Sequence, residues 1–191
     1  MTAAGALEIA MLPSAAADDV QLMAVLTSLI NDVYAVAEDG LWAQGTSRTS
    51  AEEISTLVRA GQVAVARVGG QIVGCVRIQL LECGVGEFGM LAVVPSHRSV
   101  GVGGELVRFA EQAVRTQRCE TMQLEVLVPR GWSHPSKAFI SSWYTRIGYQ
   151  PVRIGAIEET YPELAPSLAT PCDFVIYRRA LGAHEQNRQL D

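Results

Sequence analysis

The sequence EFGMLAVVPSHRSVGVGGEL occupies residues 87–106 and carries the strongest structural signal in the chain. An apolar run ends at Pro95, a glycine-rich turn follows, and apolar residues recur at helical spacing after it, which predicts a strand, a turn and a helix. The first turn of a helix leaves backbone N–H groups unpaired and carries the positive end of the helix dipole. Glycines at positions 101, 103 and 104 let an anion approach those groups, and Arg98 adds a positive charge. This stretch therefore predicts a phosphate-binding loop.

Two common phosphate-binding motifs do not fit this loop. A Walker loop requires G-x-x-x-x-G-K-[ST], and no Lys followed by Ser or Thr is present here. A dinucleotide-binding G-x-G-x-x-G opens a βαβ unit near the start of a domain, and no acidic residue follows at a matching strand end to bind a ribose. A nucleotide-binding enzyme is therefore the least favoured interpretation.

A second motif, WYTRIGY, occupies residues 143–149. Together with the V-x-P before the loop and the R-x-x-G-x-G that begins at Arg98, it resembles the GCN5-related N-acetyltransferase (GNAT) superfamily. That superfamily has a Q/R-x-x-G-x-G/A pyrophosphate signature and a later F/L-Y-x-x-x-G-F/Y segment. The resemblance covers roughly residues 63–181, and the first 60 residues match only in general helical layout. One departure is Lys137, which stands just after the loop that follows the fifth strand, where the superfamily often has an Asn.

The remaining segments alternate between two hydrophobic periods. The first helix should begin at an N-cap, either Asp18 or Asp19, and the second at the capping-box pattern that starts at Ser50. The Gly69-Gly70 turn predicts a β-hairpin. We expect strands at 7–11, 63–68, 72–81, 88–94, 122–128, 152–157 and 174–179, and helices at 19–37, 51–59, 102–117 and 136–147.

This order predicts an α/β (α+β) fold with a mixed sheet covered by helices. The resemblance implies a mostly antiparallel central sheet of about six to seven strands, splayed where acyl-CoA binds. We expect one domain over residues 1–191, with an ordered core at 7–182 and flexible ends at 1–6 and 183–191.

Composition excludes several functional classes. The net charge is −5 and no run of Lys and Arg forms a basic patch, so we expect no nucleic-acid partner. The N-terminus lacks a signal-peptide pattern and we find no run of about 18 apolar residues, so we expect no membrane partner and a soluble, cytoplasmic protein. None of the four cysteines forms a C-x-x-C pair, so we expect reduced thiols and no metal.

The resemblance implies acetyl-CoA as co-substrate. It places the pantetheine arm and the thioester oxygen along the strand at 91–93, and the pyrophosphate on the following loop. The implied cofactor-binding residues are Leu91, Ala92, Val93, Arg98, Ser99, Val100, Gly101, Val102, Gly103 and Gly104.

Acyl transfer to an amine requires a base for the amine, a donor for the developing oxyanion and an acid for the leaving thiolate. The resemblance implies Tyr144 as the acid, although this side chain could instead pack in the core and only order the cofactor. Glu87 is the implied base, or else a solvated carboxylate at a strand end. By strand period it shares a face with Gly89, Leu91 and Val93.

The first third of the chain is where this superfamily builds its acceptor pocket. Candidate substrate contacts are Tyr34, Glu38 and Trp42, together with Glu125, the second candidate base, and His134 on an unusual loop. Ordinary helix packing, a water-facing edge strand and an exposed loop are the alternative interpretations of these residues.

We therefore expect an N-acetyltransferase that moves an acetyl group from acetyl-CoA to a primary amine of a small molecule or peptide by direct attack in a ternary complex. The alternative is a non-catalytic module of the same fold that binds or senses acyl-CoA. Dimers are common in the superfamily, so a homodimer is a further expectation.

Overall fold

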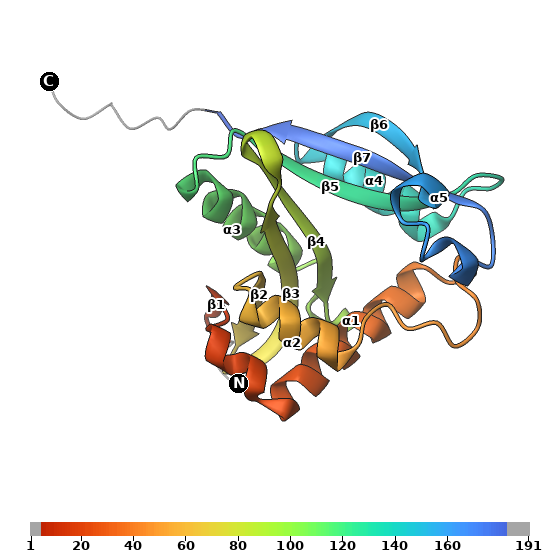
Figure 1. Ribbon diagram of the computed structural model, residues 1–191. Helices are drawn as coiled ribbons and strands as arrows, with labels where there is room; N and C mark the ends of the chain where they lie inside the picture. The colour runs from red at the N-terminus through yellow and green to blue at the C-terminus, as the bar shows by residue number, and fades with distance from the viewer. Residues whose placement is uncertain (1–4, 183–191) are drawn as a thin grey trace, which may run out of the picture.

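The protein is built around one seven-stranded sheet (Figure 1). The computed structural model describes residues 5–182, so most of the two ends with predicted flexibility, residues 1–4 and 183–191, lie outside the described residues. The strands are β1 (Leu7–Met11), β2 (Val63–Val68), β3 (Gln71–Leu80), β4 (Val85–Val93), β5 (Thr121–Pro129), β6 (Gln150–Ala156) and β7 (Cys172–Ala180). Their order is β1-β2-β3-β4-β5-β7-β6, and only the β4–β5 pair is parallel. The predicted mixed, mostly antiparallel sheet is confirmed.

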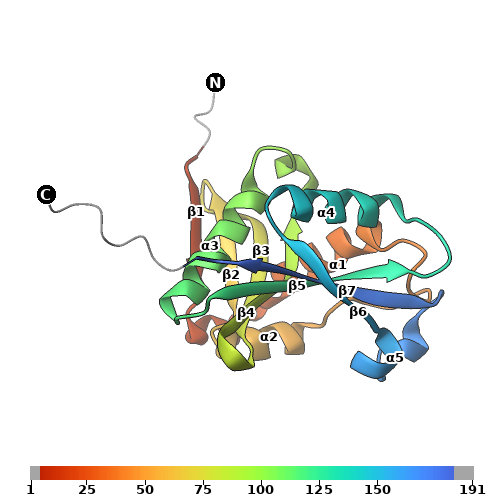
Figure 2. The ribbon, with the colours of Figure 1, turned by 90° about the horizontal axis from the view of Figure 1, so that it is seen from above.

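Helices cover both faces of this sheet (Figure 2). One face packs against α3 (Val102–Thr116) and α4 (Pro135–Arg146), and the other packs against α1 (Val20–Ala37) and α2 (Ala51–Arg59). A short helix that the sequence did not predict, α5 (Ile157–Thr160), follows β6. Single 3-10 turns occupy Ser14–Asp18, Glu82–Gly84, Pro95–His97 and Ala165–Ser167. The predicted order of the other elements is confirmed.

Local capping fixes where these helices begin. The Asp19 carboxylate accepts hydrogen bonds from the N–H groups of Gln21 and Leu22, so Asp19 rather than Asp18 caps α1. The Ser50 hydroxyl accepts from the N–H of Glu53 at the start of α2, as the capping-box pattern predicted.

Helix α1 differs from the sequence expectation in one respect. Its 18 residues have a mean hydropathy of 1.5, so by length and composition alone it is sufficient to cross a membrane, although no such segment was expected. In the structure, Met23, Leu26, Leu29 and Ile30 of α1 are buried in the core over the sheet. These four residues form the buried face of α1, whereas Val20, Val25 and Val36 of the same helix are exposed.

Strands β4 and β5 separate along their length. They pair in parallel only from Val85 to Glu87 on β4, opposite Thr121 to Gln123 on β5. Beyond Glu87 the two strands diverge, which Figure 1 shows as a fork between the two halves of the sheet. The edge of β4 that faces this fork therefore has no neighbouring strand, and its backbone hydrogen-bonding groups are available there. This is the splay that the resemblance implied.

A β-bulge interrupts β4 inside the fork. Arg77 on β3 pairs with Gly89, but Cys75 pairs with Ala92, so β4 holds one extra residue between these pairs. The extra residue coincides with a positive φ of 49° at Met90. Cys75 packs in the core under α1 and α2, so Arg77 and its partner Gly89 share that face.

The bulge changes which side chains share a face of β4. Leu91 and Val93 pack against the core on the α3 side, whereas Met90 packs against the core on the α1 side. Glu87 and Gly89 precede the bulge and remain on the α1 face. The expectation that Glu87, Gly89, Leu91 and Val93 lie on one face is therefore wrong, because a single extra residue reverses the two-residue period.

Candidate active site

The loop after β4 has the geometry of an anion site. Gly101, with φ at 93°, is the N-cap of α3, and no side chain caps this helix. Ser99 also has a positive φ, of 64°, so the loop turns twice through the left-handed region before the helix begins. A Cβ built on Gly101 or Gly104 meets no atom within 4 Å, so the space over the helix N-terminus is open. The first-turn N–H groups of α3 are thus uncapped and accessible, as a phosphate site requires.

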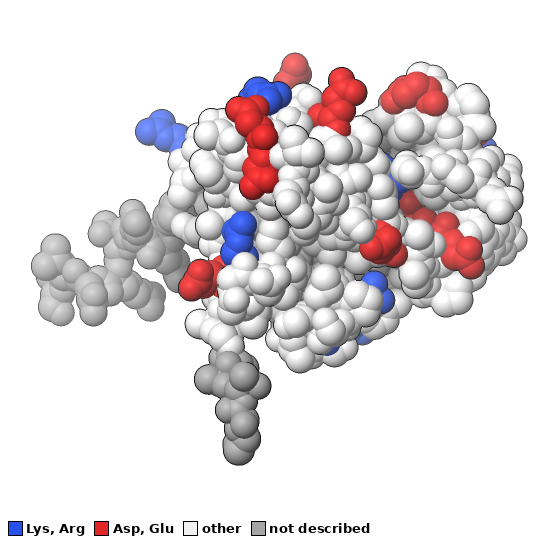
Figure 3. Space-filling model, turned by 90° about the horizontal axis from the view of Figure 1, so that it is seen from below, with Lys and Arg blue, Asp and Glu red and all other residues white. Residues whose placement is uncertain are grey.

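A cavity of about 1090 Å³ connects this loop to the fork between β4 and β5. Its lining comes from both faces of the sheet, from α1 on one side and from α3 and α4 on the other. Figure 3 shows one face of the molecule hollowed, with acidic and basic side chains in and beside the hollow. The volume is that of a site for a large ligand or for two ligands together.

The structure places most of the predicted cofactor residues on this cavity. Leu91, Val93, Arg98, Ser99, Gly101, Gly103 and Gly104 line it. The side chains of Ala92 and Val102 are instead buried in the two cores, and the Val100 side chain is exposed away from the lining. Ala92 and Val102 can therefore meet a ligand only through their backbone groups.

Tyr144 enters the cavity from α4. Its ring lies against Phe88, Trp143, Tyr149 and Tyr177, with centroid distances from 5.0 to 6.4 Å. Its hydroxyl has no hydrogen-bond partner among the residues that the structure describes. Burial raises the pKa of Tyr144 well above its ordinary value, so the phenol keeps its proton. The ring is held in place while the hydroxyl remains free to donate.

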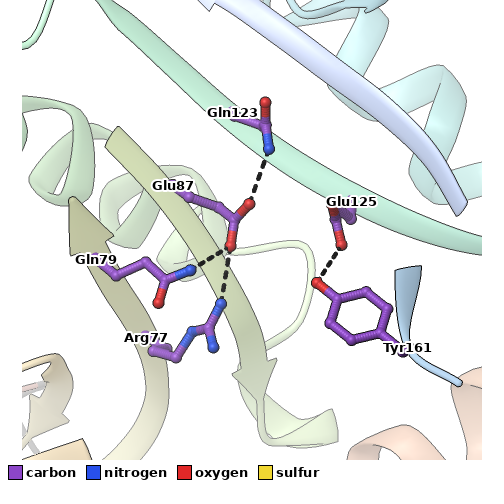
Figure 4. A network of polar contacts seen from close by, with 6 residues as sticks. All are labelled: Arg77, Gln79, Glu87, Gln123, Glu125 and Tyr161. Atoms are coloured by element: carbon purple, nitrogen blue, oxygen red, sulfur yellow. Dashed lines mark hydrogen bonds and ion pairs between the residues drawn. The ribbon is translucent and has the colours of Figure 1, made fainter. Parts of the chain in front are cut away.

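Glu87 lies at the base of the fork, where it is held by three side chains (Figure 4). Its Oε1 accepts from Arg77 Nη2 at 2.9 Å and from Gln79 Nε2 at 2.7 Å, and its Oε2 accepts from Gln123 Nε2 at 3.0 Å. Arg178 on β7 donates in turn to Gln123 Oε1 at 2.9 Å. The carboxylate thus links β3, β4 and β5 where the sheet divides.

Glu125 lies two residues further along β5, on the same face of the strand as Gln123. Its Oε2 accepts a single hydrogen bond, from the Tyr161 hydroxyl at 2.9 Å, and both side chains line the cavity (Figure 4). Desolvation by burial raises the pKa of Glu125, partly offset by the Tyr161 hydrogen bond. Glu125 is thus a partly buried carboxylate with a neutral partner and spare acceptor capacity.

The two candidate proton-transfer groups approach the fork from opposite faces of the sheet. Tyr144 belongs to the core on the α3 and α4 side. Glu125 alternates with Leu124 and Val126, which belong to that same core, so its side chain projects to the α1 side. A ligand in the fork therefore meets a proton donor from one face and a carboxylate from the other.

Tyr34 of α1 lines the α1 side of the cavity together with Arg48. The Arg48 guanidinium lies over the Tyr34 ring, with Cζ 5.2 Å from the centroid. Arg48 forms no ion pair within the described part of the chain. Burial raises the pKa of Tyr34 to about 12, against the opposing effect of the Arg48 charge.

A buried ion pair joins the end of α1 to α4 at the cavity wall. Lys137 Nζ lies 2.6 Å from Glu38 Oε1, and Trp42 Nε1 donates to Glu38 Oε2 at 2.6 Å. His134 caps α4 by accepting from the Ser136 N–H through Nδ1, while its Nε2 lies 3.0 Å from the Asp39 carbonyl oxygen. The Lys at the departure from the superfamily pattern thus has a defined structural partner.

Not all of the predicted acceptor contacts reach the cavity. Tyr34, Glu38 and Glu125 line it, whereas Trp42 and His134 lie behind its wall and support Glu38 and α4. Sequence reasoning missed Arg77 and Tyr161, which also line the cavity. A charged residue inside the apolar strand 71–80 was a usable signal for Arg77, but Tyr161 sits in an irregular segment with no local pattern.

Comparison with known families supports the same interpretation. The model of the acetyltransferase (GNAT) domain matches residues 59–151. This range includes the loop at residues 98–104 (the anion loop), the fork and Tyr144. Residues 59–151 therefore match a GNAT acetyltransferase domain. No curated protein matches the chain. Similarity to the GNAT superfamily thus rests on the domain model and on the fold.

Solved GNAT structures share this fold at low sequence identity. PaiA N-acetyltransferase from Thermoplasma acidophilum, in complex with coenzyme A, superposes with a TM-score of 0.66 at 14% identity over 92% of this chain and 99% of that one. The ribosomal-protein-S18-alanine N-acetyltransferase from Escherichia coli gives 0.61 at 15% identity over 97% and 100%. N-acetylglutamate synthase from Neisseria gonorrhoeae, complexed with coenzyme A and N-acetyl-glutamate, gives 0.61 at 18% identity over 94% of this chain but only 36% of that one.

Within residues 5–182, no group of three or more His, Cys, Asp and Glu side chains is placed to hold a metal ion. The candidate site instead consists of an anion loop, a free strand edge, one phenol and two carboxylates.

Proposed function

We propose that this protein is an N-acetyltransferase that uses acetyl-CoA and a primary amine. One observation carries the proposal: the free edge of β4 runs from the fork to the uncapped N-terminus of α3, inside one cavity. This arrangement fits a long, extended ligand with a diphosphate at one end. The backbone of β4 would bind the amide groups of the pantetheine arm, and the N–H groups of α3 would bind the diphosphate.

The side chains in the fork suit direct attack in a ternary complex. Bound acetyl-CoA supplies the activated acetyl group as a thioester. The acceptor nitrogen attacks the carbonyl carbon, a C–N bond forms and the C–S bond breaks. An N–H of the β4 backbone near the bulge would stabilise the charge that develops on the carbonyl oxygen. Two protein groups then complete the proton transfers.

Tyr144 serves as the acid in this proposal. Its hydroxyl is protonated, without a partner and fixed by the surrounding rings, so its proton is available to the departing thiolate. It approaches from the α4 face, which is also the face of the anion loop, and the sulfur of a ligand on β4 would lie there.

Glu125 is better placed than Glu87 to be the base. Three donors already occupy Glu87, so accepting a proton from an amine would break hydrogen bonds that hold the base of the fork. Glu125 accepts only one hydrogen bond, and its raised pKa brings its basicity closer to that of an effective catalyst near neutral pH. We therefore propose Glu125 as the base and Glu87 as the residue that fixes the fork.

The test is a binding and turnover experiment on wild type and two variants. Gly101→Glu places a carboxylate where the diphosphate would lie, so acetyl-CoA affinity measured by calorimetry should fall at least about 100-fold. Gly61→Glu is the matched control, because Gly61 also has positive φ, at 68°, with no atom within 4 Å of its Cβ, and it lies outside the cavity lining. Equal losses in both variants would refute the anion-site assignment.

Turnover is measured by thiol release across a panel of amines. We expect release from wild type, and Tyr144→Phe should lower kcat about 100-fold while leaving KM for acetyl-CoA nearly unchanged. An unchanged kcat in Tyr144→Phe would reject its role as the acid. Tight acetyl-CoA binding with no thiol release for any amine would instead support the non-catalytic binding module.

A further inference from the structure

The α1 side of the cavity contains positive charge that the protein does not neutralise. Arg48 is half-buried and lines the cavity, and its only contact among described residues with a charged or aromatic group is the face of Tyr34. An Arg side chain carries five N–H donors and a permanent charge, so a half-buried guanidinium usually has an anionic partner. No carboxylate of residues 5–182 fills that role for Arg48.

Arg77 is a second cation of the cavity lining with an unsatisfied hydrogen-bond donor. Its Nη2 is bound to Glu87, but its Nε is buried and has no hydrogen-bond partner in the described structure. An unpaired buried N–H of this kind costs stability unless a ligand or a water satisfies it.

Several other charges on the cavity wall have a partner within the protein, whereas Glu163 and, on the loop after β4, Arg98 line the cavity without an ion pair among the described residues. Glu38 is paired with Lys137, Glu87 with Arg77, and Glu53 accepts from the Thr49 hydroxyl at 2.7 Å. Glu125 alone combines a position at the fork with a neutral partner. The acceptor side of the cavity therefore offers one available anion at the fork and one available cation at Arg48.

We infer that the acceptor is an amino carboxylic acid, with its ammonium group near Glu125 and its carboxylate on Arg48. The inference rests on the proposed acetyl transfer, and it narrows the acceptor from any primary amine to a zwitterion. A planar guanidinium is suited to bind a carboxylate with two parallel hydrogen bonds, and stacking on Tyr34 fixes its plane. A polycationic acceptor is disfavoured because it would place positive charge against Arg48.

The test compares matched acceptors that differ only in the carboxylate. Thiol release is measured with a series of amino acids that vary the spacing between amine and carboxylate, from glycine to 6-aminohexanoate. Each is paired with its methyl ester or with the amine that lacks the carboxylate. For the best acceptor, wild type should show a kcat/KM about 10- to 100-fold above that of its partner, the range expected for a charge-assisted hydrogen-bond pair.

Variants of Arg48 assign that preference to its side chain. Arg48→Gln should remove most of the ratio between the paired acceptors, and Arg48→Lys should restore part of it, while acetyl-CoA affinity by calorimetry stays at the wild-type value. Arg59→Gln is the control for loss of one positive charge, because Arg59 is exposed, pairs with Asp18 and lies outside the cavity lining.

Each outcome bears on a different claim. Acetyl-CoA binding and turnover without preference for the carboxylate, or a preference that survives in Arg48→Gln, would overturn the inference and leave the proposed function intact. A wild-type protein that fails to bind acetyl-CoA would overturn the proposed function, and the zwitterion assignment with it.

Discussion

Individual side chains at the fork differ in how completely the protein satisfies them. Glu87 and Glu125 are both acidic residues on central strands, yet one accepts three hydrogen bonds from the protein and the other accepts one. A fully bonded carboxylate is a good structural link and a poor proton acceptor, because each bond must be broken or weakened when a proton is added. The number of partners therefore favours a structural role for Glu87 and supports the proposed role of Glu125 as the base.

This difference predicts distinct pH profiles for two isosteric variants. Glu125 must be ionised to act, and its raised pKa places the acidic limb of kcat above the pH at which an ordinary glutamate titrates. Activity should therefore rise with pH through that limb in wild type. Glu125→Gln should lower kcat by about 100-fold and abolish the limb.

Glu87→Gln provides the comparison. The Gln side chain keeps one acceptor oxygen at the fork. The acidic limb of the kcat profile should therefore remain. The main effect of the substitution should be a lower free energy of unfolding. The measurement is kcat against pH for both variants, with urea unfolding in parallel. If Glu87→Gln loses the limb and Glu125→Gln retains it, Glu87 is the base.

At the scale of elements, a bulge and an ion pair shape the two walls of the cavity. The extra residue at Met90 turns Leu91 and Val93 towards α3 and leaves Glu87 on the α1 face. On the opposite wall, Lys137 joins α4 to the end of α1 through Glu38, with both side chains less than 10% exposed. Both features set which groups meet in the cavity, and neither is a local property of a single helix or strand.

The ion pair predicts a clear loss of stability when one partner is removed. Lys137→Met leaves the Glu38 carboxylate buried with only the Trp42 N–H as partner, and should lower the free energy of unfolding by about 3 kcal/mol. The double variant Lys137→Met with Glu38→Gln removes both charges and should recover most of that loss. The free energies of unfolding of the single and double variants are compared by urea unfolding. Equal values for the two variants would show that leaving the Glu38 charge without Lys137 has no cost in stability.

Across the whole molecule, the two halves of the sheet separate at the fork and need other connections. Glu111 of α3, on the β1–β4 half, accepts from the Tyr149 hydroxyl at 2.8 Å and from Arg179 Nη1 at 2.9 Å, both on the other half. Glu111 is 4% exposed, so this link is buried. It joins the two halves of the sheet in addition to the β4–β5 pairs at the base of the fork.

Removal of this link should weaken the whole domain rather than one half. Tyr149→Phe should lower the free energy of unfolding by about 1.5 kcal/mol, the cost of one buried hydrogen bond to a carboxylate, with a single cooperative transition in urea. Tyr177→Phe is the matched control, because its ring is buried but its hydroxyl has no partner among the described residues. Two separate transitions in Tyr149→Phe would mean that the halves fold independently.

The sequence alone determined the strands, the four long helices and the glycine-rich loop between β4 and α3. Apolar period, capping residues and glycine turns are local, so Asp19, Ser50 and the Gly69-Gly70 turn fixed the element boundaries to within a few residues. The loop 98–104 was also local, because a helix N-terminus needs only its own backbone to bind an anion.

Only the tertiary structure decided which side chains meet in the fork. The two-residue period placed Glu87 and Leu91 on one face, and the bulge at Met90, which depends on pairing with β3, placed them on opposite faces. The Glu125–Tyr161 and Glu38–Lys137 contacts join residues 36 and 99 positions apart. Such contacts depend on how strands and helices pack against one another, and neither hydrophobic period nor local propensity contains that information.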